Sequence, residues 1–163
     1  MDHLEAIVEL KNIVNIDLIN KLIPLIDKKA VNNLNINGGV NTNIRNVKGY
    51  SLNFETPTNL FYWNIIKNEI ERLYLHYKSK FPLMTSGKIN QIDLLKYNPK
   101  GKYEIHTDHY TSSPRHLSII INLNDDYEGG DLIFTNQNKK EIKRYSLSKG
   151  SIIFFPSNFL YPH

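Results

Sequence analysis

Two histidines and an aspartate are the residues of this sequence best suited to hold a metal ion. His106 and Asp108 stand two positions apart in Tyr103–Asp108, a segment that is predicted to be a strand. Side chains at positions i and i+2 of a strand point to the same face, so an imidazole and a carboxylate could converge on one ion there. Taken alone, the pair could equally be a surface ion pair. A second imidazole, His163, follows another predicted strand, Ser151–Pro156.

Two imidazoles and one carboxylate on a single face predict a particular metal chemistry. Such a set leaves three coordination positions open, which is the arrangement of non-heme iron(II) oxygenases. The 163 residues contain no cysteine, which excludes thiol catalysis and cysteine-bound zinc or iron–sulfur centres. We therefore expect iron(II) at His106, Asp108 and His163, and we do not expect His109 or His116 to bind it.

The composition is that of a globular domain. Of the 163 residues, 40% are hydrophobic and 22% are charged, so the chain can bury a core without disulfides. The formal net charge is +4, but the basic residues form no block, which disfavours nucleic acid as a partner. No apolar run approaches the roughly 20 residues that cross a bilayer, and the acidic N-terminus is unlike a signal peptide. We expect a cytoplasmic protein without membrane contact, and its Asn-, Lys- and Ile-rich composition suits a viral or bacterial genome.

The N-terminal part is predicted to be rich in helices that support the metal-binding part. Asn15 is placed to cap a helix over about residues 16–30, in which Pro24 is a candidate kink. Thr56, followed by a proline, predicts the start of a longer helix that runs to Tyr77. Apolar residues at helical spacing on the second helix are interpreted as a core face. They are Leu60, Trp63, Ile66, Ile70, Leu73 and Tyr77.

From about Lys88 onward, short β-branched or aromatic runs alternate with turn residues. Several strands joined by brief turns predict an antiparallel sandwich or jelly roll. Gly129 and Gly130 are expected to form a tight turn with positive backbone angles. The expected strands are Ile89–Tyr97, Tyr103–Asp108, His116–Asn124, Asp131–Thr135, Ile142–Leu147 and Ser151–Pro156.

The predicted fold class is therefore α+β, with a double-stranded β-helix (jelly roll) core and supporting N-terminal helices. We expect a single oxygenase domain over residues 1–163. Its helix-rich support region would span residues 1–87, and its jelly-roll core residues 88–163.

Five motifs follow one another in the second half of the chain. They are YNPKGKY at 97–103 before the His-x-Asp pair, RHLS at 115–118, NLN at 122–124, YEGGDL at 127–132 and KGSIIFF at 149–155. In this order and spacing they resemble the motifs of the prolyl-4-hydroxylase-like iron(II)- and 2-oxoglutarate-dependent oxygenases. The resemblance covers residues 89–163, nearly half of the chain.

The resemblance implies a dioxygenase that hydroxylates an unactivated C–H bond. Fe(II) would be its metal, 2-oxoglutarate and O2 its co-substrates, and ascorbate a further candidate cofactor. The expected substrate is a prolyl residue in a peptide or protein, with a small molecule as the alternative. The loops Asn32–Asn43 and Thr111–Pro114 are expected to select it. The catalytic residues would be the metal ligands His106, Asp108 and His163.

The resemblance also assigns co-substrate and substrate contacts. Tyr97 and Tyr103 fall on tyrosines that line the co-substrate pocket, where a phenol can hydrogen-bond a carboxylate; both could also be plain aromatic packing. Strand alternation would turn Tyr103 away from His106. Asn122 stands where many relatives have a tyrosine that binds 2-oxoglutarate. Arg115 matches an arginine that binds a substrate carbonyl, or it forms a surface ion pair.

One feature of the family has no counterpart in this sequence. Relatives bind the far carboxylate of 2-oxoglutarate with an arginine or lysine beyond the distal histidine, whereas this sequence stops at His163. We therefore expect the jelly-roll core to be truncated at its C-terminal end. Two alternatives remain open: a cupin-like metalloenzyme that does not use 2-oxoglutarate, and a non-catalytic jelly-roll binding module.

Overall fold

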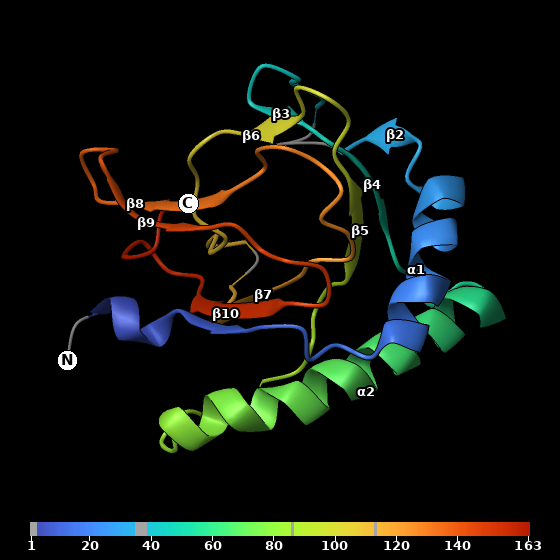
Figure 1. Cartoon of the computed structure of the whole chain (residues 1–163), viewed down its shortest axis with the longest axis horizontal. Coiled ribbons are helices and arrows are strands. Elements are labelled where there is room, and N and C mark those ends of the chain that lie inside the picture. Colours follow the sequence, from blue (N-terminus) through green and yellow to red (C-terminus); the bar gives the residue numbers. More distant parts are fainter. Residues whose placement is uncertain (1–2, 35–38, 86, 113) are drawn as a thin grey trace. The chain divides into compact units, whose positions relative to one another are not determined.

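The computed structural model describes residues 3–34, 39–85, 87–112 and 114–163 (Figure 1). These residues cluster into two compact units. The first, here called the helical unit, is Asn15–Tyr103; the second, the strand unit, joins the N-terminal segment up to Val14 with Glu104–His163. The single oxygenase domain, with a support region over residues 1–87 and a jelly-roll core over residues 88–163, stays a prediction. Within the two loops expected to select the substrate, residues 35–38 and 113 lie outside the described part of the chain.

The first helix of the helical unit, α1 (Ile16–Lys29), begins where the sequence predicted. The side chain of Asn15 accepts a hydrogen bond from the backbone N–H of Asp17 at 2.8 Å, which satisfies one of the unpaired donors of the first turn. The helix continues through Pro24. Five of its apolar residues are buried, namely Leu18, Ile19, Leu22, Leu25 and Ile26.

The second helix, α2 (Pro57–Lys80), is capped by Thr56, whose hydroxyl accepts from the backbone N–H of Asn59 at 3.1 Å. The predicted core face is buried except for Leu60, which is 44% exposed. That part of the prediction is wrong because the first turn directs Asn59 inward, where its amide donates to Tyr50. Within the described residues, no helix is long and apolar enough to cross a membrane.

Two small antiparallel sheets complete the helical unit. One has the strand order β2-β4-β5, and the strands β4 and β5 contact α1. The other pairs β3 with β6, so the neighbouring strands β3 and β4 belong to different sheets. The strands are β2 (Asn32–Asn33), β3 (Arg45–Asn46), β4 (Lys48–Ser51), β5 (Asp93–Lys96) and β6 (Lys102–Tyr103).

The strand unit is built around β10, which pairs with β1 on one side and β7 on the other, while β8 and β9 form a hairpin (Figure 1). Gly129 and Gly130 precede β8 with φ angles of 75° and 69°, which confirms the predicted positive backbone angles. The chain thus combines helices with antiparallel sheets. The elements are the 3-10 helix His3–Ala6, β1 (Val8–Leu10), β7 (Leu117–Ile121), β8 (Leu132–Thr135), β9 (Glu141–Tyr145) and β10 (Ile152–Pro156).

A charged side chain ties α2 to the start of α1. Glu69 accepts a hydrogen bond from the backbone N–H of Asn15 at 2.7 Å and two from the guanidinium of Arg72 at 2.8 and 2.9 Å. Its side chain is 9% exposed. The hydrogen bonds from Arg72 lower the pKa of Glu69 below its usual 4.5 despite burial, and the Asn15 N–H acts in the same direction.

We predict that Glu69→Gln lowers the free energy of unfolding at pH 7 by roughly 1–2 kcal/mol, because hydrogen bonds to a charged acceptor are stronger than those to a neutral one. Because the pKa of Glu69 is lower in the folded state than in the unfolded state, the ionised side chain stabilises the fold at a pH above its unfolded-state pKa. This stabilisation is lost as the pH falls through the folded-state pKa. The difference between wild type and variant should therefore shrink below about pH 4.5. The free energy of unfolding is measured by urea titration at each pH, with the fluorescence of Trp63, the single tryptophan, as the signal.

The matched control is Glu71→Gln on the same helix. Glu71 is exposed and forms a 3.5 Å ion pair with Lys67, and exposed pairs contribute little. Equal losses in the two variants, or a difference that persists undiminished at acid pH, would contradict the role given to Glu69.

Candidate metal centre

The backbone brings the two predicted histidine ligands together by a direct main-chain pairing. The N–H of His106 donates to the carbonyl of His163, and the N–H of His163 donates to the carbonyl of His106, each at 2.9 Å. Reciprocal bonds of this kind are those of directly opposed residues in antiparallel chains, whose side chains project to the same face. The ring centroids of the two imidazoles are accordingly 4.4 Å apart.

The prediction of a strand over Tyr103–Asp108 is wrong beyond Tyr103, where β6 ends. Both His106 and Asp108 lie outside the assigned strands, so strand alternation is not what places them. The pairing with His163 does so instead, because it fixes the His106 backbone from across the chain.

The three side chains that the sequence singled out do converge. Nε2 of His106 lies 3.4 Å from Oδ1 of Asp108, and Nε2 of His163 lies 3.7 Å from Oδ2 of Asp108. One candidate ligand atom from each residue lies within 4.8 Å of the other two. Nitrogen and carboxylate ligands bind metals at about 2.0–2.2 Å, so atoms with this mutual spacing could share one ion.

Each histidine has a fixed tautomer. Nδ1 of His106 lies 2.9 Å from the carbonyl oxygen of Glu104, and Nδ1 of His163 lies 3.0 Å from that of Tyr161. A carbonyl oxygen only accepts, so both Nδ1 atoms carry a proton, and Nε2 is the nitrogen of each ring that remains to bind a metal. Histidine ligands of metals usually have their second nitrogen anchored in this manner. The donor set therefore fits a metal ion.

His163 is the most enclosed of the three, with a side chain that is 6% exposed. Its ring packs against those of Phe134 and Phe155, with centroid distances of 5.7 and 4.7 Å. Burial lowers the pKa of His163, although the charge of Asp108 acts in the opposite direction. The neutral imidazole is the form that binds a metal.

Asp108 is held as an ionised carboxylate. Burial favours the neutral acid, but the hydrogen bond with His106, the charge of His163 and the hydrogen bond from Ser118 together keep the pKa of Asp108 well below its usual range. The Ser118 hydroxyl donates to Oδ2 at 2.6 Å. Sequence reasoning missed Ser118 as a site residue, although it stands in the RHLS motif.

The predicted substrate residue, Arg115, contacts the backbone of Asp108. Its Nη1 is 3.5 Å from the backbone oxygen of Asp108. The carbonyl of Arg115 in turn is bonded to Nδ1 of His109 at 2.9 Å, so that histidine supports the loop before β7. Arg115 is thus part of the surroundings of the candidate metal centre.

Asn122 has little hydrogen-bonding capacity left for a co-substrate. Its amide donates to the carbonyls of Asn124 and Leu147, both at 2.7 Å, and its Oδ1 accepts from the hydroxyl of Tyr127 at 3.2 Å. Both amide hydrogens are therefore engaged, so a carboxylate could bind them only after one of these bonds breaks.

The two predicted co-substrate tyrosines belong to the helical unit, whereas the triad belongs to the strand unit. Tyr97 follows β5 and is 50% exposed. Tyr103 pairs in register with Arg45, whose guanidinium carbon lies 4.6 Å from the centre of the tyrosine ring. Their proposed role in co-substrate binding stays a prediction.

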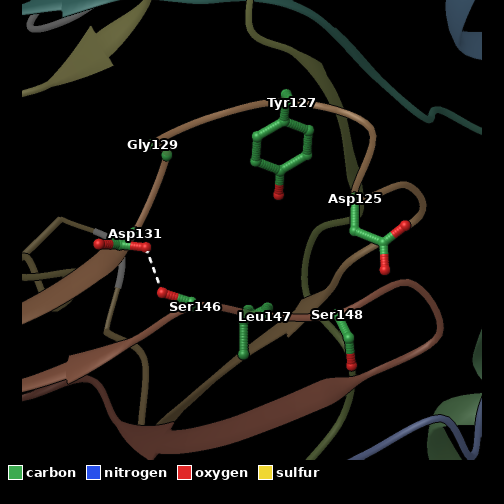
Figure 2. A pocket seen from close by; sticks show the side chains of 8 residues that line it. Asp125, Tyr127, Gly129, Asp131, Ser146, Leu147 and Ser148 are labelled. Carbon is green, nitrogen blue, oxygen red and sulfur yellow. Dashed lines mark hydrogen bonds between the residues drawn. The ribbon is translucent and has the colours of Figure 1, made fainter.

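Two pockets lie on the strand unit. The first, of about 300 Å³, contains none of the three triad residues, and its two carboxylates disfavour a dicarboxylate ligand (Figure 2). It is lined by Asp125, Tyr127, Gly129, Gly130, Asp131, Ser146, Leu147 and Ser148. The second, of about 280 Å³, reaches the triad through His106. Its other lining residues are Ile105, Thr107, Asn136, Gln137, Lys139 and Pro162.

Comparison with known proteins agrees with this geometry, which is that of a centre with two histidines and one carboxylate. Residues 92–163 match the model of the 2OG-Fe(II) oxygenase superfamily, and all three triad residues lie in that stretch. This part of the chain is therefore similar to the 2OG-Fe(II) oxygenases, a class that uses Fe(II), 2-oxoglutarate and dioxygen. No curated protein matches the chain.

Solved structures of prolyl hydroxylases share the fold. A prolyl-4-hydroxylase from Pseudomonas putida has a TM-score of 0.73 at 18% identity, covering 99% of this chain and 87% of its own. A Trichoplax adhaerens prolyl hydroxylase, in complex with a hypoxia-inducible-factor peptide fragment, has a TM-score of 0.70 at 13% identity, covering 99% and 78%. The viral collagen prolyl hydroxylase of Paramecium bursaria Chlorella virus-1, in its 2OG complex, has a TM-score of 0.58 at 17% identity, covering 93% and 77%.

We predict that Mn(II) raises the thermal unfolding temperature by several degrees and that EDTA reverses the rise. A ligand that binds only the folded state stabilises it by about 2.7 kcal/mol at a hundredfold excess over its Kd. His106→Ala should abolish the shift, whereas His116→Ala should keep it, because His116 has an exposed side chain outside the triad. An equal shift in His106→Ala and wild type would refute metal binding at this site.

Proposed function

We propose that the chain is an iron(II)- and 2-oxoglutarate-dependent dioxygenase that hydroxylates a prolyl residue in a peptide or protein. The observation that carries the proposal is the convergence of two imidazoles and one carboxylate inside the stretch matched by the oxygenase family. His106, Asp108 and His163 would hold the iron. The peptidyl-proline substrate is supported by the similar structures, which are prolyl hydroxylases, one of them bound to a peptide.

The residues of this chain would bind and orient the reactants. Bound iron supplies, with 2-oxoglutarate and dioxygen, the power to oxidise an unactivated C–H bond while succinate and carbon dioxide are released. The two Nε2 atoms and the carboxylate would occupy three positions and leave the others open. Phe134 and Phe155 shield the His163 side from water, because their rings cover that imidazole.

We also propose which residues contact the co-substrate and the substrate. Arg115 would bind a carbonyl of the peptide, which its position beside Asp108 supports. Tyr97 and Tyr103 would contact 2-oxoglutarate, as the YNPKGKY motif suggests. Asn122 would join them only if one of its two amide N–H groups left its backbone carbonyl.

We further infer that the strand unit forms a jelly-roll core within a single oxygenase domain. Antiparallel pairing of β1, β10 and β7, together with the β8–β9 hairpin, supports this inference. The fold likeness to prolyl hydroxylases over nearly the whole chain is consistent with it.

We predict that the protein, supplied with Fe(II), 2-oxoglutarate and proline-containing peptides, releases succinate and adds the mass of one oxygen atom to a peptide. Asp108→Ala should abolish both products, because the only carboxylate of the triad is lost. The control Asp126→Ala removes an exposed carboxylate outside the triad and should leave turnover intact. Mass spectrometry and succinate detection measure the outcome, and full activity of Asp108→Ala would refute the triad.

An anaerobic titration separates the alternatives. Fe(II) followed by 2-oxoglutarate should produce the weak visible absorption band of their complex. Metal binding without the band would indicate a cupin-like metalloenzyme, and no metal binding would indicate a non-catalytic module. Succinate release with a small molecule but with no peptide would move the substrate away from peptidyl proline.

A further inference from the structure

Two serines form a hydrogen-bonded chain that ends on the carboxylate of the candidate metal centre. Ser118 lies on β7, and its hydroxyl is 2.6 Å from Oδ2 of Asp108. The same hydroxyl oxygen is 2.8 Å from Oγ of Ser157, which follows β10 directly. β7 and β10 are paired strands, so the two serines are brought together by the sheet itself.

The two hydrogen bonds that link Ser157, Ser118 and Asp108 have only one possible order of donors and acceptors. The hydroxyl of Ser118 donates to the Asp108 carboxylate oxygen Oδ2. A serine hydroxyl has one proton, and that of Ser118 is given to Asp108. Ser157 must therefore be the donor in the bond between the two hydroxyls, and the order is Ser157 to Ser118 to Asp108.

Ser157 is itself fixed by its main chain. Its N–H donates to the carbonyl of His116 at 3.1 Å, and its carbonyl accepts from the N–H of His109 at 3.0 Å. His109 immediately follows Asp108, and His116 immediately precedes β7. Ser157 is 1% exposed, so its position is set by packing as well as by these bonds.

We propose that Ser157 and Ser118 are positioning residues that set the rotation of the Asp108 carboxylate before any metal binds. The serine hydrogen bond holds Oδ2 and leaves Oδ1 directed at the imidazole of His106, 3.4 Å from its Nε2. An aspartate χ2 torsion is otherwise broad, so an unheld carboxylate would have to be ordered on metal binding. The inference rests on the proposed function and adds to it the residues that orient one ligand.

Co(II) titration of the full chain tests the inference, with affinity from calorimetry and ligand geometry from the visible absorption of the bound ion. Ser118→Ala should weaken Co(II) binding about 10- to 100-fold, the usual effect of losing a hydrogen-bond partner of a metal ligand. Ser157→Ala should weaken it about tenfold, because Ser118 then loses the donor that fixes its hydroxyl. Both should change the visible spectrum, and Ser118→Thr, which keeps a hydroxyl, should restore most of the affinity.

A serial arrangement makes a sharper prediction for the double variant. Without the Ser118 hydroxyl, Ser157 is no longer linked to Asp108 by hydrogen bonds. The double variant Ser118→Ala, Ser157→Ala should therefore bind Co(II) no more weakly than the single variant Ser118→Ala. Losses that multiply would mean that the serines act independently and would overturn the chain.

The matched control is Ser151→Ala. Ser151 is also fully buried in the strand unit, and its hydroxyl is bonded to that of Ser148 at 2.8 Å. This variant should lose thermal stability as the others do, yet keep the wild-type Co(II) affinity and spectrum. A similar loss of Co(II) affinity in Ser151→Ala would mean that the loss in the Ser118 and Ser157 variants comes from general destabilisation of the fold, and would overturn the inference.

The failure of this inference is distinguishable from that of the proposed function. If the wild type binds Co(II) and the Ser118 and Ser157 variants bind it equally well with the same spectrum, the positioning role is wrong while the metal centre stands. If the wild type binds no Co(II), the proposed function and the inference fail together.

Discussion

The reciprocal backbone pairing of His106 with His163 is the interaction on which the candidate site depends. Two hydrogen bonds of 2.9 Å join segments that lie far apart in the sequence and outside the assigned strands. Because directly opposed residues project to one face, the pairing sets the imidazoles side by side. The carbonyl two residues before each histidine then fixes the ring so that Nε2 faces Asp108.

A partly buried carboxylate would be costly without hydrogen-bond donors to satisfy it. Asp108 has such a donor in Ser118, and the histidines lower its pKa further. The low pKa of Asp108 favours its charged form and the lowered pKa of His163 favours its neutral form, and these are the forms that bind a metal ion. The same contacts that stabilise this charge also decide which way it points.

The strand β10 connects this chemistry to the core. Its residues Ile152, Ile153, Phe154 and Phe155 are fully buried, and it pairs on both sides, with β1 and with β7. Phe155 packs against the ring of His163, and the next residue but one, Ser157, starts the hydrogen-bonded chain to Asp108. A rigid central strand therefore positions the site from both the apolar and the polar side.

The sequence by itself determined the helix starts at Asn15 and Thr56, the positive backbone angles at Gly129 and Gly130, and the identity of the three converging side chains. These follow from local rules of capping and backbone freedom, or from residue types in a fixed order. It did not determine how the triad converges, since the strand expected under His106 and Asp108 is absent and a long-range backbone pairing takes its place. Nor did it show that Ser157 stands behind Asp108, that Asn122 is engaged by backbone carbonyls, or that Asn59 replaces Leu60 in the core. Each of those depends on which distant segments lie against one another, and only the tertiary structure decides that.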